Sequence, residues 1–137
     1  MTNFSFAVLI SGNGSNLQAM MDAIEGNQIS GKICCVLSNK EDAYGLQRAQ
    51  EVKIPTEVVS NKDFETREDF DAEMVRVLSI YNPDLVVLAG FMRILSPVFI
   101  NAFTGKILNI HPSLLPKYPG LNTHERVLES SDNIHGI

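Results

Sequence analysis

The sequence predicts an α/β fold, a doubly wound and mostly parallel sheet that forms a single domain over residues 1–137. Short apolar runs alternate with helical segments along the chain, which is typical of right-handed βαβ units. Residues 85–88 are apolar at every position, as in a strand buried on both faces of a parallel sheet. A glycine-rich turn at residues 11–16 separates the first apolar run from the first helix. Together these features are typical of a Rossmann-like fold.

The first half of the chain predicts three strands and two helices. Residues 6–10 form an apolar strand, and a helix that begins near Ser15 and stops at Gly26 has apolar residues at helical spacing. Ser15 and Gln18 have the spacing of a capping box at the start of this helix. The next elements are a strand at residues 33–37, a helix at residues 43–51 and a strand at residues 55–59.

The second half predicts a long helix, a buried strand and a short helix. The long helix ends before Asn82-Pro83, and its apolar face consists of Phe70, Met74, Val77, Leu78 and Tyr81. The buried strand at residues 85–88 is connected by residues 89–95 to a helix with Ser96 as its N-cap, Pro97 at its first position and Gly105 just past its end. The remaining elements are a strand at residues 107–110, a loop at residues 112–120 and a helix at residues 123–130.

The two cysteines of the chain, Cys34 and Cys35, are adjacent in the second predicted strand. Neighbouring side chains on a strand point to opposite faces of the sheet, so an ordinary disulfide between them is not expected. We expect both to be reduced thiols of the core. The nearby sequence offers no further ligands for a metal site.

Charge and hydropathy exclude several classes of function. The formal net charge of -5 argues against a surface for nucleic acid or anionic membranes. No apolar run approaches the length of a membrane span, and the N-terminal segment lacks the basic region of a signal peptide. The sequence therefore predicts a cytoplasmic protein, monomeric or homodimeric, that binds small molecules.

Three segments are expected to meet at one edge of the sheet. We call residues 11–16 the glycine loop and residues 89–95 the 89–95 loop. These two loops and His111 each follow a predicted strand. Ligands of doubly wound sheets bind beyond the carboxyl ends of the strands, so the three segments predict a shared cleft.

The glycine loop has the composition of a phosphate site. Its glycines allow a ligand to approach the backbone, and the free amides at the start of a helix suit a phosphate. The spacing is neither G-x-G-x-x-G nor that of a P-loop, which disfavours a dinucleotide or ATP and favours a single phosphomonoester. A purely structural turn is the alternative.

Asn109 and His111 stand two positions apart at the end of the fifth strand, directly before Pro112, so their side chains are expected to share a face. An amide and a histidine suit the stabilisation of an oxyanion and the movement of a proton in acyl transfer. No serine or cysteine occupies a nucleophile elbow. Direct transfer without a covalent enzyme intermediate is therefore favoured, and a structural histidine is the alternative.

The 89–95 loop predicts an apolar slot suited to a flat heteroaromatic ring. The apolar residues around Arg93 are Phe91, Met92, Ile94 and Leu95. Ordinary loop packing is the alternative. Arg67 could meet a ligand carboxylate, although a solvated surface position is the expected one for an arginine.

These motifs resemble those of a known family. They are L-I-S-G-N-G-S-N-L-Q-A at residues 9–19, V-V-L-A-G-F-M-R-I-L-S-P at residues 86–97 and L-N-I-H-P-S-L-L-P-K-Y-P-G at residues 108–120. The H-P-S-L-L-P element is similar in other formyl-folate enzymes. The glycine loop, with its serine and asparagine, more specifically resembles the phosphoribosylglycinamide formyltransferases.

The resemblance implies transfer of a formyl group from the cosubstrate 10-formyltetrahydrofolate to the amine of glycinamide ribonucleotide, in purine biosynthesis and without a metal. It implies that Asn109 binds the developing oxyanion and that His111 acts as general acid. The implied phosphate-binding residues are Gly14, Ser15 and Asn16. The implied folate-binding residues are Arg67, Met92, Arg93, Ile94, Leu95 and Asn109.

The sequence departs from the family pattern near its end. In the family a catalytic aspartate follows the H-G that is here His135-Gly136, but this sequence ends at Ile137. The resemblance thus implies the N-terminal portion of a formyltransferase whose C-terminal part is missing, with little turnover of its own. The alternatives are a methionyl-tRNA formyltransferase, a formyltetrahydrofolate hydrolase and a non-catalytic ligand-binding fragment. The acidic charge counts against the tRNA enzyme, and the lack of an N-terminal regulatory domain counts against the hydrolase.

Overall fold

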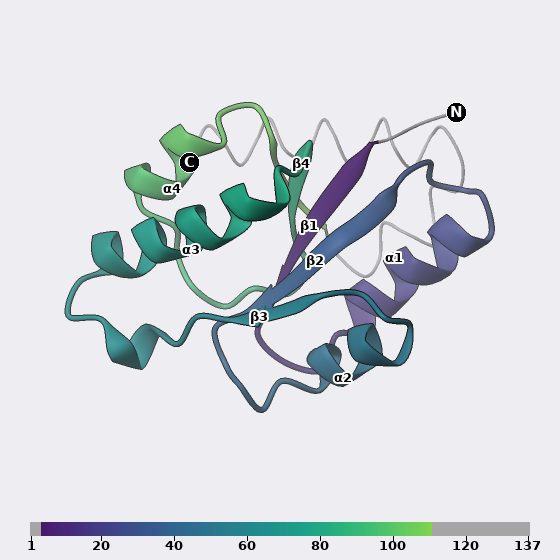
Figure 1. The fold of residues 1–137 in the computed structure, drawn as a ribbon, viewed down its shortest axis with the longest axis horizontal. Coiled ribbons are helices and arrows are strands. Elements are labelled where there is room, and N and C mark those ends of the chain that lie inside the picture. Colours follow the sequence, from purple (N-terminus) through teal and green to yellow (C-terminus); the bar gives the residue numbers. More distant parts are fainter. Residues whose placement is uncertain (1–3, 111–137) are drawn as a thin grey trace.

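The computed structural model of the protein describes residues 4–110. Within this range strands and helices alternate along the chain (Figure 1). The strands are β1 (Ser5–Ile10), β2 (Lys32–Ser38), β3 (Thr56–Val58), β4 (Leu85–Leu88) and β5 (Ile107–Asn109). The helices are α1 (Ser15–Glu25), α2 (Tyr44–Glu51), the short 3₁₀-helix η1 (Asn61–Asp63), α3 (Arg67–Tyr81) and α4 (Pro97–Ala102).

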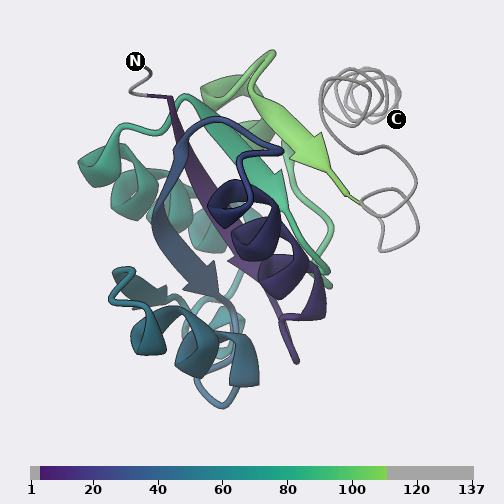
Figure 2. The ribbon, with the colours of Figure 1, turned by 90° about the vertical axis from the view of Figure 1, so that its right-hand side faces the viewer.

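The five described strands form one parallel sheet in the order β3-β2-β1-β4-β5. The chain starts in the middle with β1, moves outward through β2 and β3, and then returns to the other side of β1 for β4 and β5. Helices α1 and α2 cover one face of the sheet, and α3 and α4 cover the other (Figures 1 and 2). The predicted doubly wound parallel sheet is confirmed.

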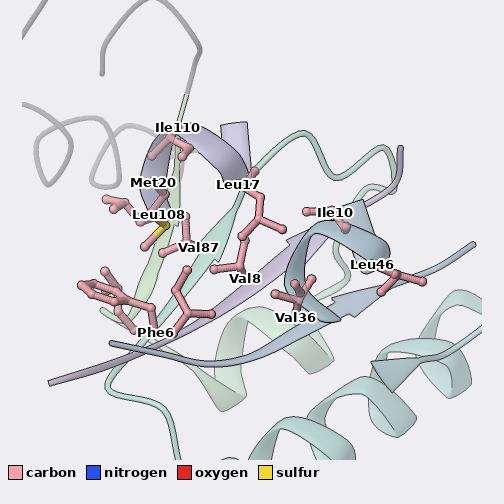
Figure 3. Close-up of a cluster of buried hydrophobic side chains, with 14 of the residues drawn as sticks. Phe6, Val8, Ile10, Leu17, Met20, Val36, Leu46, Val87, Leu108 and Ile110 are labelled. Atoms are coloured by element: carbon pink, nitrogen blue, oxygen red, sulfur yellow. The ribbon is translucent and has the colours of Figure 1, made fainter. Parts of the chain in front are cut away.

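One apolar cluster lies between the sheet and the helices α1 and α2 (Figure 3). Alternate residues of β1, Phe6, Val8 and Ile10, contribute to it, since side chains two positions apart share a face of a strand. Leu17 of α1 and Leu46 of α2 pack onto them. Burial of each such side chain stabilises the fold by about 1.5–3 kcal/mol.

A second apolar cluster lies under α3 and α4. It takes the other residues of β1, Ala7 and Leu9, so β1 is buried on both faces, as a central parallel strand should be. The predicted apolar face of α3 is confirmed: Phe70, Met74, Val77 and Leu78 are buried and Tyr81 packs against the cluster. The helix ends at Tyr81, and its C-cap residue Asn82 adopts the left-handed conformation directly before Pro83.

Helix starts are less well predicted than the helices themselves. The capping box of Ser15 and Gln18 is wrong, because α1 begins at Ser15 with Gly14 as its N-cap and no side-chain cap. Gln18 instead donates to Asp22 Oδ1 at 3.0 Å. Ser96 is the N-cap of α4 as predicted, but its hydroxyl makes no cap hydrogen bond. Helix α4 ends at Ala102, a little before the predicted stop at Gly105.

The opposite orientation predicted for the two cysteines is also wrong. The register of β1 against β2 shifts between Phe6 and Ala7, which pair with Ile33 and Cys35, so Cys34 is the extra residue of a β-bulge. Both cysteines therefore pack against the cluster under α3 and α4. Both are free thiols, as expected, but only Cys35 is fully buried.

The Cys35 thiol donates a hydrogen bond to the Cys34 sulfur, which is the main reason that the pKa of Cys34 is lowered to about 7. The Ser5 hydroxyl and the charge of Lys32 lower this pKa further, against the opposing effect of burial. The same hydrogen bond, followed by burial, raises the pKa of Cys35 above its ordinary value. The pair thus combines a partly exposed thiol of lowered pKa with a buried thiol of raised pKa. Among the helices of residues 4–110, none has the length and apolarity needed to cross a membrane.

Candidate functional site

Two of the three predicted segments meet beyond the carboxyl ends of β1 and β4, which are neighbours in the sheet. The backbone of Ala89 donates to Leu9 at 2.9 Å, so the 89–95 loop leaves β4 beside the end of β1. The amide of Met92 then donates to the hydroxyl of Ser11 in the glycine loop at 2.8 Å. The predicted meeting of these two loops is therefore confirmed by a direct contact.

Gly14 gives the glycine loop its shape. It has φ +82°, a conformation that side chains rarely adopt, and a Cβ at this position would lie 2.6 Å from Gly45 Cα. Gly45 in α2 in turn donates its amide to the carbonyl of Gly12 at 3.0 Å. The loop therefore turns tightly into α1 and packs directly on the backbone of α2, which only a glycine allows.

Ser15 and Asn16, the other predicted phosphate-binding residues, are the first two residues of α1. Ser15 is exposed and Asn16 is buried. The first turn of α1 has no acidic residue and no side-chain cap, so no side chain of that turn competes for its amides. Free amides and the positive end of a helix dipole are features that suit an anion.

Arg48 of α2 braces the glycine loop, a role that sequence patterns do not reveal. Its Nε donates to the carbonyl oxygen of Asn13 at 2.8 Å and its NH2 group to Asn13 Oδ1 at 2.7 Å. A further bond runs from its NH1 group to Gln18 Oε1 at 3.2 Å, and the guanidinium stacks 4.9 Å from the ring centroid of Tyr44. A positive charge is thereby fixed beside the start of α1.

The side chains of residues 92–94 are exposed, whereas Phe91 packs against the cluster under α3 and α4. Met92 and Ile94 are 76% and 72% exposed, and Arg93 is exposed as well. Leu95 is half-buried and packs against the cluster under α3. The Arg93 guanidinium lies 5.8 Å from the ring centroid of Phe70. Large exposed apolar residues beside a cleft are available to a ligand.

The 89–95 loop is fixed at its far end by a buried carboxylate. Asp71 of α3 is 0% exposed, and its Oδ2 accepts a hydrogen bond from the amide of Ser96 at 2.6 Å. Asp71 Oδ1 and the Ser96 hydroxyl have no hydrogen-bond partner within the described part of the chain. Together with the Ser11 contact, this bond holds the backbone of the loop at two points.

A polar hollow of about 670 Å³ opens beside the 89–95 loop. Met92 and Arg93 line one side of it, and segments that follow β2 and β3 line the other. Its remaining lining residues are Asn39, Lys40, Glu41, Asp42, Ser60, Asn61, Lys62 and Asp63. Arg67 is exposed at the first residue of α3.

Asn109 is the last residue of β5, half-buried and in register with Leu88 of β4. Its neighbours Leu108 and Ile110 belong to the cluster under α1 and α2, so strand alternation turns Asn109 toward the face covered by α3 and α4. His111 lies outside the described residues, and so does its predicted pairing with Asn109. Within residues 4–110 there is no group of three or more His, Cys, Asp or Glu side chains able to hold a metal ion.

Comparison with known proteins agrees with this arrangement. Residues 4–137 match the family described as Formyl transferase. The chain is 54% identical over 132 residues to a phosphoribosylglycinamide formyltransferase of Escherichia coli, covering 96% of this chain and 62% of that protein. It is 48% identical to the human trifunctional purine biosynthetic protein adenosine-3, covering 95% of this chain and 13% of that protein.

A solved structure shares the fold. The phosphoribosylglycinamide formyltransferase of Coxiella burnetii superimposes with a TM-score of 0.77 at 48% identity, over 95% of this chain and 61% of that one. The chain therefore spans about three fifths of the length of these two phosphoribosylglycinamide formyltransferases.

Proposed function

This chain belongs to the formyl transferase family, and we propose that the protein it represents transfers a formyl group from 10-formyltetrahydrofolate to the amine of glycinamide ribonucleotide. The observation that carries the proposal is the 54% identity, over 96% of the chain, to a relative named for this reaction. The contact between the glycine loop and the 89–95 loop supports it, because the two loops would serve the two substrates.

The acceptor would bind at the glycine loop. Its phosphate would rest on the amides of Gly14, Ser15 and Asn16, at the uncapped and uncharged start of α1. The fixed guanidinium of Arg48 adds a positive charge behind this loop. Since one phosphate needs one cluster of amides, a phosphomonoester matches this site better than a dinucleotide does.

The donor would bind along the 89–95 loop. The exposed apolar side chains of Met92 and Ile94 offer surface to a flat pterin ring, and Arg93 and Leu95 complete the loop. The polar hollow that begins at Met92 and Arg93 continues away from the ring site. We place the polar end of the donor there, with Arg67 as a further contact to its carboxylates.

The chemical step would take place near Asn109. The acceptor amine attacks the formyl carbon, the carbonyl oxygen becomes an oxyanion, and the Asn109 amide donates a hydrogen bond to it. The bond from the formyl carbon to the donor nitrogen then breaks, while one proton leaves the amine and one reaches the departing nitrogen. We assign this proton movement to His111, with the imidazole as general acid.

An acceptor comparison tests the proposal. The complete gene product is supplied with formyl-labelled donor and with glycinamide ribonucleotide, charged initiator tRNA or water alone. We expect label in formylglycinamide ribonucleotide. Label in the tRNA or in free formate instead would assign the protein to another branch of the formyl-folate enzymes. Binding of glycinamide ribonucleotide without any transfer would indicate a ligand-binding protein.

A further inference from the structure

Ser11, the first residue after β1, connects loops that follow three different strands. Its hydroxyl accepts a hydrogen bond from the amide of Met92 at 2.8 Å and donates one to Asn39 Oδ1 at 2.6 Å. Ser11 and Asn39 are only 4% and 3% exposed. The Asn39 side chain follows β2, and its Nδ2 donates to Asn61 Oδ1 in η1 at 3.3 Å.

The direction of these bonds is fixed by chemistry. An amide oxygen can only accept, so the single hydroxyl proton of Ser11 must point to Asn39. A lone pair of Ser11 is then left for the amide proton of Met92. The bond to Asn61 keeps the oxygen of Asn39, rather than its nitrogen, toward Ser11. The Ser11 hydroxyl thus uses its one proton toward Asn39 and a lone pair toward Met92, and a buried network satisfied in this way favours one arrangement.

This arrangement lies between the two loops that we assign to the two substrates. Ser11 directly precedes the turn that leads to Gly14, and Met92 is in the middle of the 89–95 loop. Transfer between two bound molecules requires their reacting atoms to be held close together and aligned. A hydroxyl that joins the two loops sets the spacing between their backbones. The Met92 side chain takes no part in this connection: it is 76% exposed, and only the backbone amide of Met92 bonds to Ser11.

We propose that Ser11 is a positioning residue for formyl transfer, whose hydroxyl holds the backbone of Met92, and with it the donor loop, against the start of the acceptor loop. Asn39 directs the hydroxyl proton. The inference rests on the proposed function and goes beyond it, because Ser11 is not among the residues assigned to touch a substrate.

Steady-state kinetics of Ser11→Ala in the complete gene product tests this role. We expect kcat/KM for the formyl donor to fall by about tenfold, because the loop loses its central attachment. The affinity for glycinamide ribonucleotide alone should change by less than about twofold, since Arg48 still braces the glycine loop. Ser79→Ala is the matched control: Ser79 is an exposed serine on α3, and its replacement should leave both quantities unchanged.

Two further readouts separate positioning from plain stability. Hydrogen exchange of the Met92 amide should be faster in Ser11→Ala, and Ser11→Thr, which keeps a hydroxyl, should recover most of the lost donor kcat/KM. If Ser11→Ala does not fold, Ser11→Cys should show a smaller loss in the same direction, because a thiol is a weaker donor and acceptor than a hydroxyl. A folded Ser11→Ala with lower thermal stability but normal donor kinetics would overturn the inference. A wild-type protein without transfer to glycinamide ribonucleotide would instead overturn the proposed function.

Discussion

Gly14 and Gly45 lie back to back, with a Cβ built on Gly14 only 2.6 Å from the Cα of Gly45. This contact joins the turn before α1 to the first turn of α2, and it determines where the amides at the start of α1 are held. A side chain at Gly14 would also have to adopt φ +82°. The close approach of these two glycines is therefore the structural basis of the proposed phosphate site.

Gly14→Ala is expected to destabilise the protein by about 1–3 kcal/mol, because it combines backbone strain with a steric clash. Urea unfolding followed by circular dichroism measures this. Gly12→Ala is the control, because a Cβ at Gly12 has no heavy atom within 4 Å. Equal stability of the two variants would contradict the tight packing described here.

Arg48→Ala should weaken binding of glycinamide ribonucleotide by several-fold, since the glycine loop loses its brace and a nearby positive charge. It should also lower stability by about 1 kcal/mol through the lost hydrogen bonds to Asn13. Isothermal titration calorimetry gives the affinity. Arg76→Ala removes an exposed arginine that pairs with Glu73, and it should leave binding unchanged. If both variants bind equally well, Arg48 has no part in the site.

Asp71→Ala should lower stability by about 1–3 kcal/mol, because it leaves the buried amide of Ser96 without its acceptor. Asp71→Asn is the control, since it keeps an oxygen for this bond, and it should cost less. Thermal and urea unfolding of the two variants checks the difference. Equal losses for the two variants would show that the bond to Ser96 contributes nothing to stability.

Cys34 should react with iodoacetamide with a midpoint at a pH of about 7, because its pKa is lowered to about 7 and the thiolate is the reactive form. The labelling rate should rise with pH through this range and then level off, whereas an ordinary thiol is still gaining thiolate near pH 9. Mass spectrometry should find Cys34 modified and Cys35 intact in the folded protein.

Cys35→Ala provides the second half of that test. It removes the hydrogen bond that contributes most to the lowered pKa of Cys34, so the labelling midpoint should move to higher pH. Labelling of Cys34 with the same midpoint in both proteins would exclude the hydrogen bond as the cause. Rapid labelling of Cys35 in the wild type would contradict its burial.

The fold could be predicted because its signals are local. Residues 85–88 are apolar throughout, and β4 has these bounds in the structure. The apolar face from Phe70 to Tyr81 likewise follows from spacing alone. The bulge at Cys34 could not be predicted, because it is a property of the pairing between β1 and β2 rather than of either strand.

The candidate site was only partly visible in the sequence for the same reason. Glycine-rich composition and the end of an apolar run indicate the glycine loop and Asn109. The contacts of Ser11 with Met92 and of Arg48 with Asn13 join residues 81 and 35 positions apart. No periodicity or short motif encodes such pairs, so the residues that brace the loops can be identified only from the three-dimensional structure.

The central claim is that the acceptor and the donor bind at the carboxyl edge of the sheet, on the glycine loop and the 89–95 loop. Backbone amide chemical shifts of the isotope-labelled complete gene product, recorded during titration with each substrate, test it most directly. We predict that glycinamide ribonucleotide shifts the amides of Gly14, Ser15 and Asn16, and that the formyl donor shifts those of residues 92–95. Shifts confined to the apolar hollow at the opposite end of the sheet, around Met21, Ile33 and Val52, would contradict it.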